Sequence, residues 1–254
     1  MKLAAWNVNS LNVRLPHVID WLRQHQPDAL CLQELKLEDA KFPLAAIEDA
    51  GYSAAFDGQK TYNGVAILTR KRAEDVARGM PDFPDEQKRV IAATVDGVRV
   101  VCVYIPNGQD TESDKYQYKL RWLDALAGYM QKQIGEYKDV ALLGDYNIAP
   151  DDRDVHDPKA WEGKVLCSAP ERAAFQRLID LGMKDSFRLF EQPEKSFSWW
   201  DYRMNGFRRN LGLRIDHVLL TDGLAARCAS STIDVEPRKL ERPSDHAPVM
   251  ATLN

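Results

Sequence analysis

The chain has 254 residues, a formal net charge of −4, a pI of about 5.8 and 44% hydrophobic residues. This length and apolar content suit one large α/β or β-sandwich domain spanning residues 1–254, and no stretch is apolar for long enough to cross a membrane. The acidic balance excludes a basic footprint over the whole chain, although a local basic face for nucleic acid can coexist with an acidic centre.

The start of the chain and the cysteines bear on its compartment. Polar residues follow Met1 too closely for a secretory signal. The four cysteines, Cys31, Cys102, Cys167 and Cys228, are far apart and form no CxxC pair, so we interpret them as reduced thiols. These features predict a cytoplasmic protein.

Short apolar runs bounded by Gly, Pro or Asp recur along the chain and are typical of strands. They are Leu3–Trp6, Ala29–Leu32, Val65–Leu68, Val90–Ala93, Val98–Tyr104, Val140–Leu143, Ile215–Leu220 and Val249–Leu253. Asp96-Gly97, between two of these runs, predicts a tight hairpin.

Three segments with helical periodicity lie between the runs. Leu15–Gln24 and Lys115–Lys132 repeat apolar residues at helical spacing. Ser168-Ala169-Pro170-Glu171 is a capping box with Pro in the first turn, so it predicts a helix that ends near Gly182. Because helices mix with hairpins and with strand–helix–strand units, we predict two mixed sheets packed face to face, with helices outside.

Polar side chains stand at the ends of several predicted strands. Asn7 and Glu34 follow the first two, and Asp145 and Asn147 follow Val140–Leu143 at a spacing that points both to one side. Carboxylates and carboxamides suit a hard ion such as Mg²⁺ or Mn²⁺, and no Cys/His spacing indicates zinc. Taken singly, each of these residues is better explained by a turn or a surface position, so the prediction depends on the whole set.

Two acids near the C-terminus can be paired with a histidine. Asp245 could ligate a metal, and the adjacent His246, with an ordinary pKa of about 6.5, is a ready proton-transfer group. Asp216 ends the apolar strand Leu213–Asp216, so its carboxylate needs a donor. A histidine ring N–H is one natural partner, and the neighbouring Arg214 is the weaker alternative, because adjacent strand residues face opposite ways.

Two segments have the composition of substrate-binding surfaces. The run Phe197–Arg203 interleaves aromatic rings, among them Trp199, with the cation Arg203, and could stack on bases or sugars. Tyr62 and Asn63, with lysines and arginines nearby, could contact phosphates. The alternatives are core aromatics for the first segment and a solvated loop for the second.

With these residues in view, the sequence resembles the exonuclease III family of bacterial DNA-repair nucleases, within the endonuclease/exonuclease/phosphatase superfamily. Nine short motifs in the family's order, spread nearly from end to end, carry the resemblance. They are Trp6–Leu11, Leu32–Lys36, Tyr62–Ala66, Tyr104–Gly108, Leu143–Pro150, Trp161–Arg172, Phe197–Arg203, Gly212–Asp216 and Arg242–Pro248.

The resemblance implies an α/β fold of four layers, an αββα sandwich whose active site lies at one rim of the two sheets. It implies a Mg²⁺ cofactor, replaceable by Mn²⁺, with Glu34 as the main ligand. Four further residues would surround the metal or its alternative position: Asn7, Asp145, Asn147 and Asp245.

The resemblance also implies catalytic roles. Asp145 would position or deprotonate the attacking water or act as a general acid, and Asn147 would hold the transition state. Tyr104 would contact the scissile phosphate. His246, oriented by Asp216, would bind the phosphate or act as the base. Whether Asp145 or His246 is the base stays open.

The implied substrate is double-stranded DNA with abasic sites, nicks or blocked 3′ ends, bound by a monomer. Backbone contacts would come from Lys36, Tyr62 and Asn63, and Asn107 and Arg203 would also bind the substrate. An abasic sugar would enter a pocket of Trp199, Leu213 and Ile215. In some relatives that act on 3′ ends, a bulky His obstructs this sugar. The corresponding stretch here has no His but does have Leu166.

The resemblance therefore implies a phosphodiesterase with 3′→5′ exonuclease, 3′-phosphatase or 3′-phosphodiesterase activity and incision at abasic sites. One alternative is a phosphatase of the same superfamily that acts on phosphoinositides or sphingolipids, which the aromatic run and the basic loop from Arg203 to Arg209 disfavour. Another is a non-catalytic DNA-binding module, which the complete set of acids, amides and histidine disfavours.

Overall fold

The structure, a computed structural model, describes residues 1–254, and its strands form two six-stranded sheets and a two-stranded ribbon. The first sheet has the order β13 (Cys228–Ile233), β14 (Val249–Leu253), β1 (Lys2–Asn7), β2 (Ala29–Gln33), β4 (Val65–Thr69) and β3 (Ser53–Asp57). The second has the order β5 (Glu74–Arg78), β6 (Val90–Val95), β7 (Val98–Tyr104), β8 (Val140–Asp145), β12 (Asp216–Thr221) and β9 (Met183–Asp185). The ribbon pairs β10 (Trp199–Trp200) with β11 (Gly212–Leu213).

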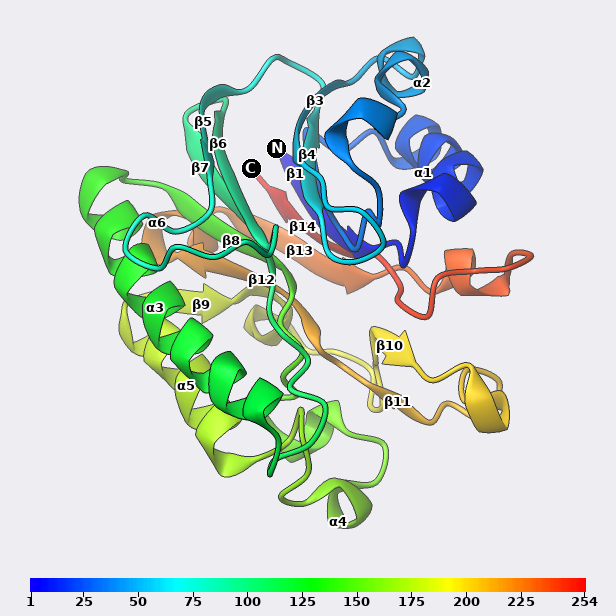
Figure 1. The fold of residues 1–254 in the computed structure, drawn as a ribbon, viewed down its shortest axis with the longest axis vertical. Coiled ribbons are helices and arrows are strands. Elements are labelled where there is room, and N and C mark those ends of the chain that lie inside the picture. The colour runs from blue at the N-terminus through cyan, green and yellow to red at the C-terminus, as the bar shows by residue number, and fades with distance from the viewer.

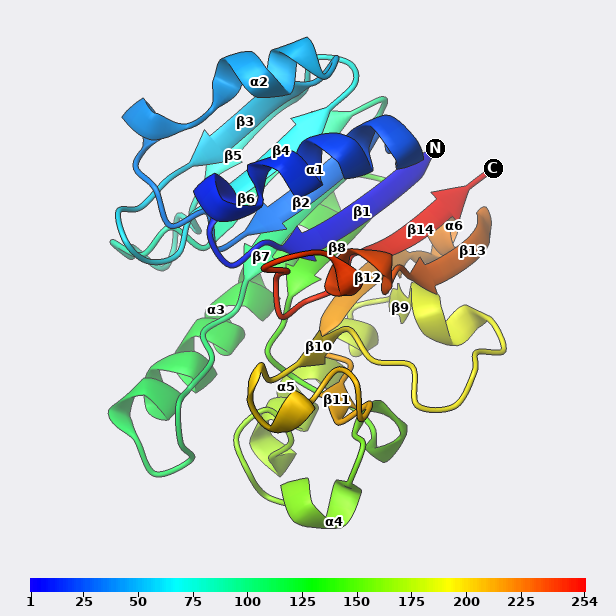
Figure 2. The ribbon, with the colours of Figure 1, turned by 90° about the vertical axis from the view of Figure 1, so that its right-hand side faces the viewer.

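Helices cover the outer face of each sheet. The helices are α1 (Leu11–His25), α2 (Leu44–Asp49), α3 (Asp114–Glu136), α4 (Pro158–Trp161), α5 (Ala169–Asp180) and α6 (Asp222–Ala225). One apolar cluster joins α1 and α2 to the first sheet, and another joins α3 and α5 to the second. Figure 1 shows these two helical layers on opposite sides of the sheets, and Figure 2 shows α1 crossing in front of β1 and β2.

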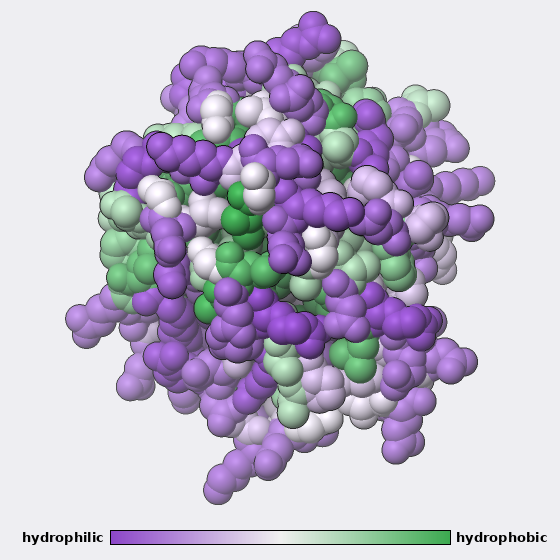
Figure 3. All heavy atoms as spheres, turned by 90° about the vertical axis from the view of Figure 1, so that its left-hand side faces the viewer, coloured by the Kyte–Doolittle hydropathy of each residue, from purple (hydrophilic) through white to green (hydrophobic).

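The inner faces of the two sheets share a core. Twenty buried residues form it, with Ala5 and Cys31 from the first sheet and Ala93, Cys102 and Leu143 from the second. The four-layer αββα sandwich is thus confirmed. None of the helices combines the length and hydrophobicity that a membrane span needs. The face over α3 and α5 is mostly hydrophilic, with a smaller hydrophobic area near its middle (Figure 3).

Seven of the eight predicted apolar runs lie within observed strands, and the eighth, Ile215–Leu220, starts one residue before β12. The hairpin at Asp96-Gly97 is confirmed, with both residues at positive φ. Within the two six-stranded sheets, four strands lie outside the predicted runs, and these strands, β3, β5, β9 and β13, are the outer strands. Polar residues occur in each of these edge strands, as is common where one side of a strand is unpaired, so they lack a continuous apolar run. The predicted helices are also present, and α1 begins four residues earlier than expected, at Leu11.

One strand prediction is wrong. Leu213–Asp216 does not form a single strand, because β11 ends at Leu213 and β12 begins at Asp216. Between them Arg214 is buried and bonds to Asp154 (2.6 Å) and Asp185 (2.7 Å), not to Asp216. The backbone here has other partners, since the Arg214 N–H donates to the Asp154 carbonyl (2.9 Å) and the Ile215 carbonyl accepts from the Tyr146 N–H (2.9 Å).

The strand directions bring many chain segments to one rim. β1 runs parallel to β2, and β7 runs parallel to β8, so each pair ends at the same edge. β12 is antiparallel to β8 and β14 is antiparallel to β1, so these two strands begin at that edge. The topology therefore gathers the segments that contain Asn7, Glu34, Asp145, Asp216 and His246.

Candidate active site

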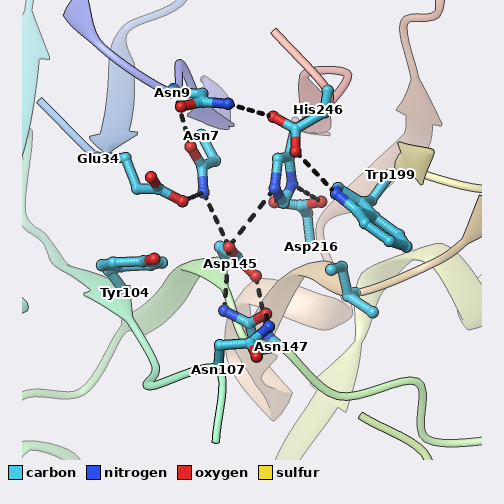
Figure 4. A network of polar contacts seen from close by, with 12 residues as sticks. Asn7, Asn9, Glu34, Tyr104, Asn107, Asp145, Asn147, Trp199, Asp216 and His246 are labelled. Carbon is cyan, nitrogen blue, oxygen red and sulfur yellow. Dashed lines mark hydrogen bonds and ion pairs between the residues drawn. The ribbon is translucent and has the colours of Figure 1, made fainter. Parts of the chain in front are cut away.

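Asn7 connects the two sheets at this rim. Its side-chain amide donates to Glu34 (2.9 Å) and to Asp145 (2.9 Å) (Figure 4). Glu34 follows β2 in the first sheet, whereas Asp145 ends β8 in the second, so one amide fixes the spacing of two acids. Ligand atoms of Glu34, Asp145 and His246 all lie within 4.8 Å of one another, as a metal site requires.

Lys36 lies within this centre. Its Nζ is 2.8 Å from Glu34 and 2.5 Å from the Asn9 side-chain oxygen. Glu34 and Lys36 both have φ of +55°, a conformation that turns the chain sharply after β2 and brings both side chains to the rim. The residue predicted to contact the DNA backbone thus also neutralises the candidate metal ligand.

Asp145 is buried, and its position depends on the glycine before it. Gly144 has φ of +145°, and a Cβ there would lie 1.9 Å from the Val103 carbonyl oxygen, so no other residue fits. Burial raises the pKa of Asp145 to about 7, although His246 and the Asn7 amide oppose the shift. A carboxyl group with this pKa can both accept and release a proton near neutrality.

His246 and Asp216 form the predicted carboxylate–imidazole pair. The Nδ1 atom of His246 is 2.9 Å from Asp216 Oδ2, and Nε2 is 3.7 Å from Asp145 Oδ2. Burial lowers the pKa of His246, but the two carboxylates outweigh burial and raise it to about 10. Ser198 fixes Asp216 by donating to its carboxylate (2.7 Å). The imidazole is therefore held in one orientation and favoured as a cation.

Asp245 directly precedes His246 in the chain and has its own hydrogen-bond donors. Its oxygens accept from Asn9 (2.9 Å) and from the indole N–H of Trp199 (3.0 Å). Burial would raise the pKa of Asp245, but the His246 charge and these two donors lower it below its ordinary value. The structure thus connects Asp245 to the centre through Asn9 and not through Asn7.

Asn147 is fully engaged by hydrogen bonds. Its amide group donates to the Ile105 carbonyl (3.0 Å) and to Asp145 (3.2 Å), and its oxygen accepts from Asn107 (2.9 Å). This places Asn147 and Asn107, two predicted site residues, in direct contact beside Asp145. Asn147 has φ of +50°, which Asn tolerates better than most residues.

Tyr104 ends β7 and faces the same acids. Burial raises the pKa of Tyr104 well above its ordinary value, and the charges of Glu34 and Asp145 add to this shift. The guanidinium of Arg89 lies 4.6 Å from the Tyr104 ring centre. The phenol therefore stays protonated and can donate a hydrogen bond.

A groove of about 930 Å³ opens beside Tyr104. Its walls include five predicted residues, which are Tyr62, Asn63, Tyr104, Asn107 and Arg203. They also include two cations that the sequence reasoning missed, Arg89 and Lys115. Tyr62 and Asn63 from one predicted substrate surface and Arg203 from the other therefore line the same groove.

The predicted sugar pocket is a packed apolar cluster. Leu213 and Ile215 are fully buried, Leu166 is 4% exposed, and Trp199 packs against them while partly exposed. Leu166 has φ of +74° and belongs to the same cluster. The segment predicted to border the pocket thus touches the side chains predicted to form it.

Several residues that shape the site had no role in the sequence reasoning. Asn9 hydrogen-bonds both Lys36 and Asp245. Its position two residues after Asn7 could have indicated that both side chains point to the same side. Ser198 donates to Asp216, and Arg89 stacks on Tyr104. Neither contact has a local sequence signal, because each joins segments far apart in the chain.

The fold and the site define a hydrolase built on an α/β sandwich. The model of the Endonuclease/Exonuclease/phosphatase family matches residues 4–246, and the chain belongs to this family. It is 38% identical to exodeoxyribonuclease III of Haemophilus influenzae over 99% of each chain. The resemblance seen in the sequence is confirmed.

Solved structures agree with this assignment. A 3′-phosphatase from Neisseria, bound to a product DNA hairpin, is 49% identical with a TM-score of 0.98, and the match covers 100% of this chain and 99% of that one. An AP endonuclease from Archaeoglobus fulgidus is 39% identical with a TM-score of 0.96, and the match covers 100% and 99%.

Proposed function

We propose that this protein is a Mg²⁺-dependent DNA-repair phosphodiesterase, a single catalytic domain over residues 1–254. It would remove phosphates and other blocking groups from 3′ ends and cut 5′ to abasic sites. The observation that carries this proposal is the cluster of Glu34, Asp145 and His246, in which Asp145 pairs across the sheet with Tyr104, a residue of the groove wall. The DNA bound in the Neisseria relative and the AP endonuclease activity named for the Archaeoglobus relative support the substrate class.

The donor set fits a hard divalent ion. Glu34 and Asp145 offer carboxylate oxygens around the Asn7 amide, and Glu34 keeps 17% of its side chain exposed, so an ion can reach it. We assign Glu34 as the main ligand, with Asn7, Asp145, Asn147 and Asp245 as the further candidates. When bound, Mg²⁺ would supply positive charge that neutralises the developing charge on phosphoryl oxygens.

The residues of the chain itself would divide the remaining tasks. His246 has a carboxylate at each ring nitrogen, so the imidazolium would donate toward a phosphoryl oxygen. Asp145 would accept the proton of the attacking water, because its pKa is raised to about 7 by burial. Tyr104, kept protonated, would donate to the scissile phosphate. Asn147 would hold the transition state by exchanging its longest amide bond, the one to Asp145 (3.2 Å), for a phosphoryl oxygen.

The groove would hold DNA through a local basic surface. Tyr62, Asn63, Asn107 and Arg203 line its walls, and Lys36, paired with Glu34, would add a further backbone contact. The net charge of −4 is compatible with this role, since the acids gather at the centre and the cations line the approach. Trp199, with Leu213 and Ile215 behind it, would receive an abasic sugar.

The test uses three duplexes, one with an abasic site, one with a nick carrying a 3′-phosphate and one with blunt ends. Each is incubated with Mg²⁺ and with EDTA. Glu34→Ala should lose most activity and recover part of it in high Mn²⁺. Glu38→Ala, which removes a half-exposed acid paired with Lys41, is the control. Full activity in EDTA, or hydrolysis of phosphoinositides in place of DNA, would refute the proposal.

A further inference from the structure

A buried ion pair lies behind the candidate active site. Lys119, in the second turn of α3, and Glu171, in the first turn of α5, have no exposed surface, and their Nζ and Oε1 atoms are 2.5 Å apart. Removal of two charges from water is costly, and the pair repays this cost only through further hydrogen bonds. The groups that bond to Lys119 and Glu171 therefore indicate the role of this ion pair.

Lys119 binds the backbone of the two loops that contain Asn107 and Asn147. Its ammonium donates to the carbonyls of Asn147 (2.7 Å) and Asn107 (3.1 Å) as well as to Glu171. An ammonium has three N–H donors, so all of them are used. Because the Asn107 side chain donates to the Asn147 side chain, one cation fixes both ends of that contact.

Glu171 binds the segment that contains Leu166. Its Oε1 also accepts from the Leu166 N–H (3.0 Å), and Oε2 accepts from the N–H and the hydroxyl of Ser168 (3.1 and 2.6 Å). The predicted capping box is thus present, but the carboxylate does more than cap α5. It holds Leu166 in its positive-φ conformation, against Leu213 and Ile215.

The segments that Lys119 and Glu171 bind are also packed tightly against each other. A Cβ on Gly108 would lie 3.1 Å from Lys119 Cδ and 3.2 Å from Val165 Cγ2. The hydroxyls of Tyr116 and Ser168 are 2.6 Å apart. The start of α3 therefore contacts the loop after β7 and the Leu166 segment at the same time.

We propose that Lys119 and Glu171 are positioning residues that couple the loops of Asn107 and Asn147 to the Leu166 segment. The pair would set the turnover rate through Asn147, and the choice between abasic sites and 3′ ends through Leu166. This proposal rests on the proposed function. Its physical basis is that a displacement of about 1 Å at a reacting centre can cost on the order of 10²-fold in rate.

The test compares Lys119→Met, Glu171→Gln and Ser168→Ala with a matched control. The control is Asp124→Asn, which breaks an exposed pair with Arg177 between the same two helices. kcat and KM are measured on the 3′-phosphate and abasic duplexes, well below the Tm of each variant. Lys119→Met should lower kcat by about 10- to 100-fold while KM stays within about threefold.

The other variants separate the two parts of the proposal. Glu171→Gln should lower kcat and also change the ratio of the two activities, and Ser168→Ala should change the ratio with a smaller loss of kcat. Asp124→Asn should match the wild type. Unchanged kcat and ratio in the first three variants would overturn the proposal, as would equal losses in the control.

A further comparison distinguishes positioning from stability. The double variant Lys119→Met/Glu171→Gln leaves no unpaired charge buried, so its Tm should exceed that of Lys119→Met. Its kcat should stay low, because the Asn107 and Asn147 carbonyls still lack the ammonium donor. Recovery of kcat together with Tm would overturn the proposal.

Amide hydrogen exchange tests the coupling without any activity. In Glu171→Gln, exchange should become faster at Leu166 and Ser168 and also at Ile105 and Asn147, whose N–H groups donate to Asp145. Faster exchange confined to Leu166 and Ser168 would overturn the coupling. Wild-type protein without turnover on any DNA duplex would instead refute the proposed function, and the exchange result would still stand.

Discussion

Asp216→Asn removes one charge from the pair with His246 and keeps the size of the side chain. In the wild type the carboxylate lies 2.9 and 3.1 Å from His246 Nδ1 and also accepts from Ser198. Asp216 is the largest of the influences that raise the pKa of His246. The substitution should therefore lower this pKa from about 10 toward its ordinary value.

The size of the effect on activity follows from the lost orientation and charge. An amide can still bond to Nδ1, but it no longer favours the imidazolium or a single tautomer. Loss of a positioned proton-transfer group costs about 10² to 10⁴ in rate, so kcat should fall by this amount with Mg²⁺ present. KM should change little, because the groove residues are untouched.

The stability of the protein should respond to pH in a defined direction. A raised pKa means that the folded state binds the His246 proton more tightly than the unfolded state does. This contribution is fully present below the ordinary pKa of about 6.5 and is lost as pH rises through about 10. The Tm of the wild type should therefore fall over this range, and the Tm of Asp216→Asn should fall less.

NMR titration of the His246 ring in EDTA and single-turnover rates on the 3′-phosphate duplex check these expectations. Asp222→Asn, which changes an exposed acid at the other end of β12, is the control. An unchanged His246 titration, or a kcat within threefold of the wild type, would refute the reasoning about the pair.

Three further outcomes are expected. Leu166→Gly should raise abasic-site incision relative to 3′-phosphate removal, and Leu166→His should lower it, because Leu166 packs in the same cluster as Trp199. If both variants keep the wild-type ratio of the two activities, other residues set the substrate preference. The logarithm of duplex affinity should fall linearly with the logarithm of salt concentration, by about 0.9 for each phosphate contacted, whereas a flat response would indicate a small phosphate ester. Arg214→Met should destabilise the fold by about 3–5 kcal/mol in urea titrations, because Asp185 loses its ion-pair partner and Asp154 keeps only Arg188. A loss below about 1 kcal/mol would contradict this.

Residues at strand ends were the most predictable part of the site. Asn7, Glu34 and Asp145 each follow an apolar run. The parallel pairing of β1 with β2 brings Asn7 and Glu34 to one edge, where the Asn7 amide reaches Asp145 of the other sheet. The His246 pair with Asp216 was also predictable, because a buried carboxylate needs a donor. Interior strands were predictable for a related reason, since burial on both faces gives a continuous apolar run.

Features that depend on distant pairing were not predictable from local sequence. Lys119 is a charge on the apolar face of α3, and its partner Glu171 is 52 residues away, where local sequence indicates only a helix cap. The break at Arg214 has the same origin, because its partner Asp154 is 60 residues distant. The polar edge strands were hidden because an unpaired edge removes the apolar pattern.

The division of the centre between two sheets has a consequence for how the enzyme would fail. Asn7 and Glu34 belong to one sheet and Asp145 and Asp216 to the other, so their spacing is only as exact as the seam between the sheets. Small side chains such as Ala5 and Ala93 lie within that seam. A bulkier residue there would move the two sheets apart and so separate the acids without contacting them. The turnover rate should then fall before any spectroscopic sign of unfolding. The turnover rate should therefore depend on the distance between the two sheets.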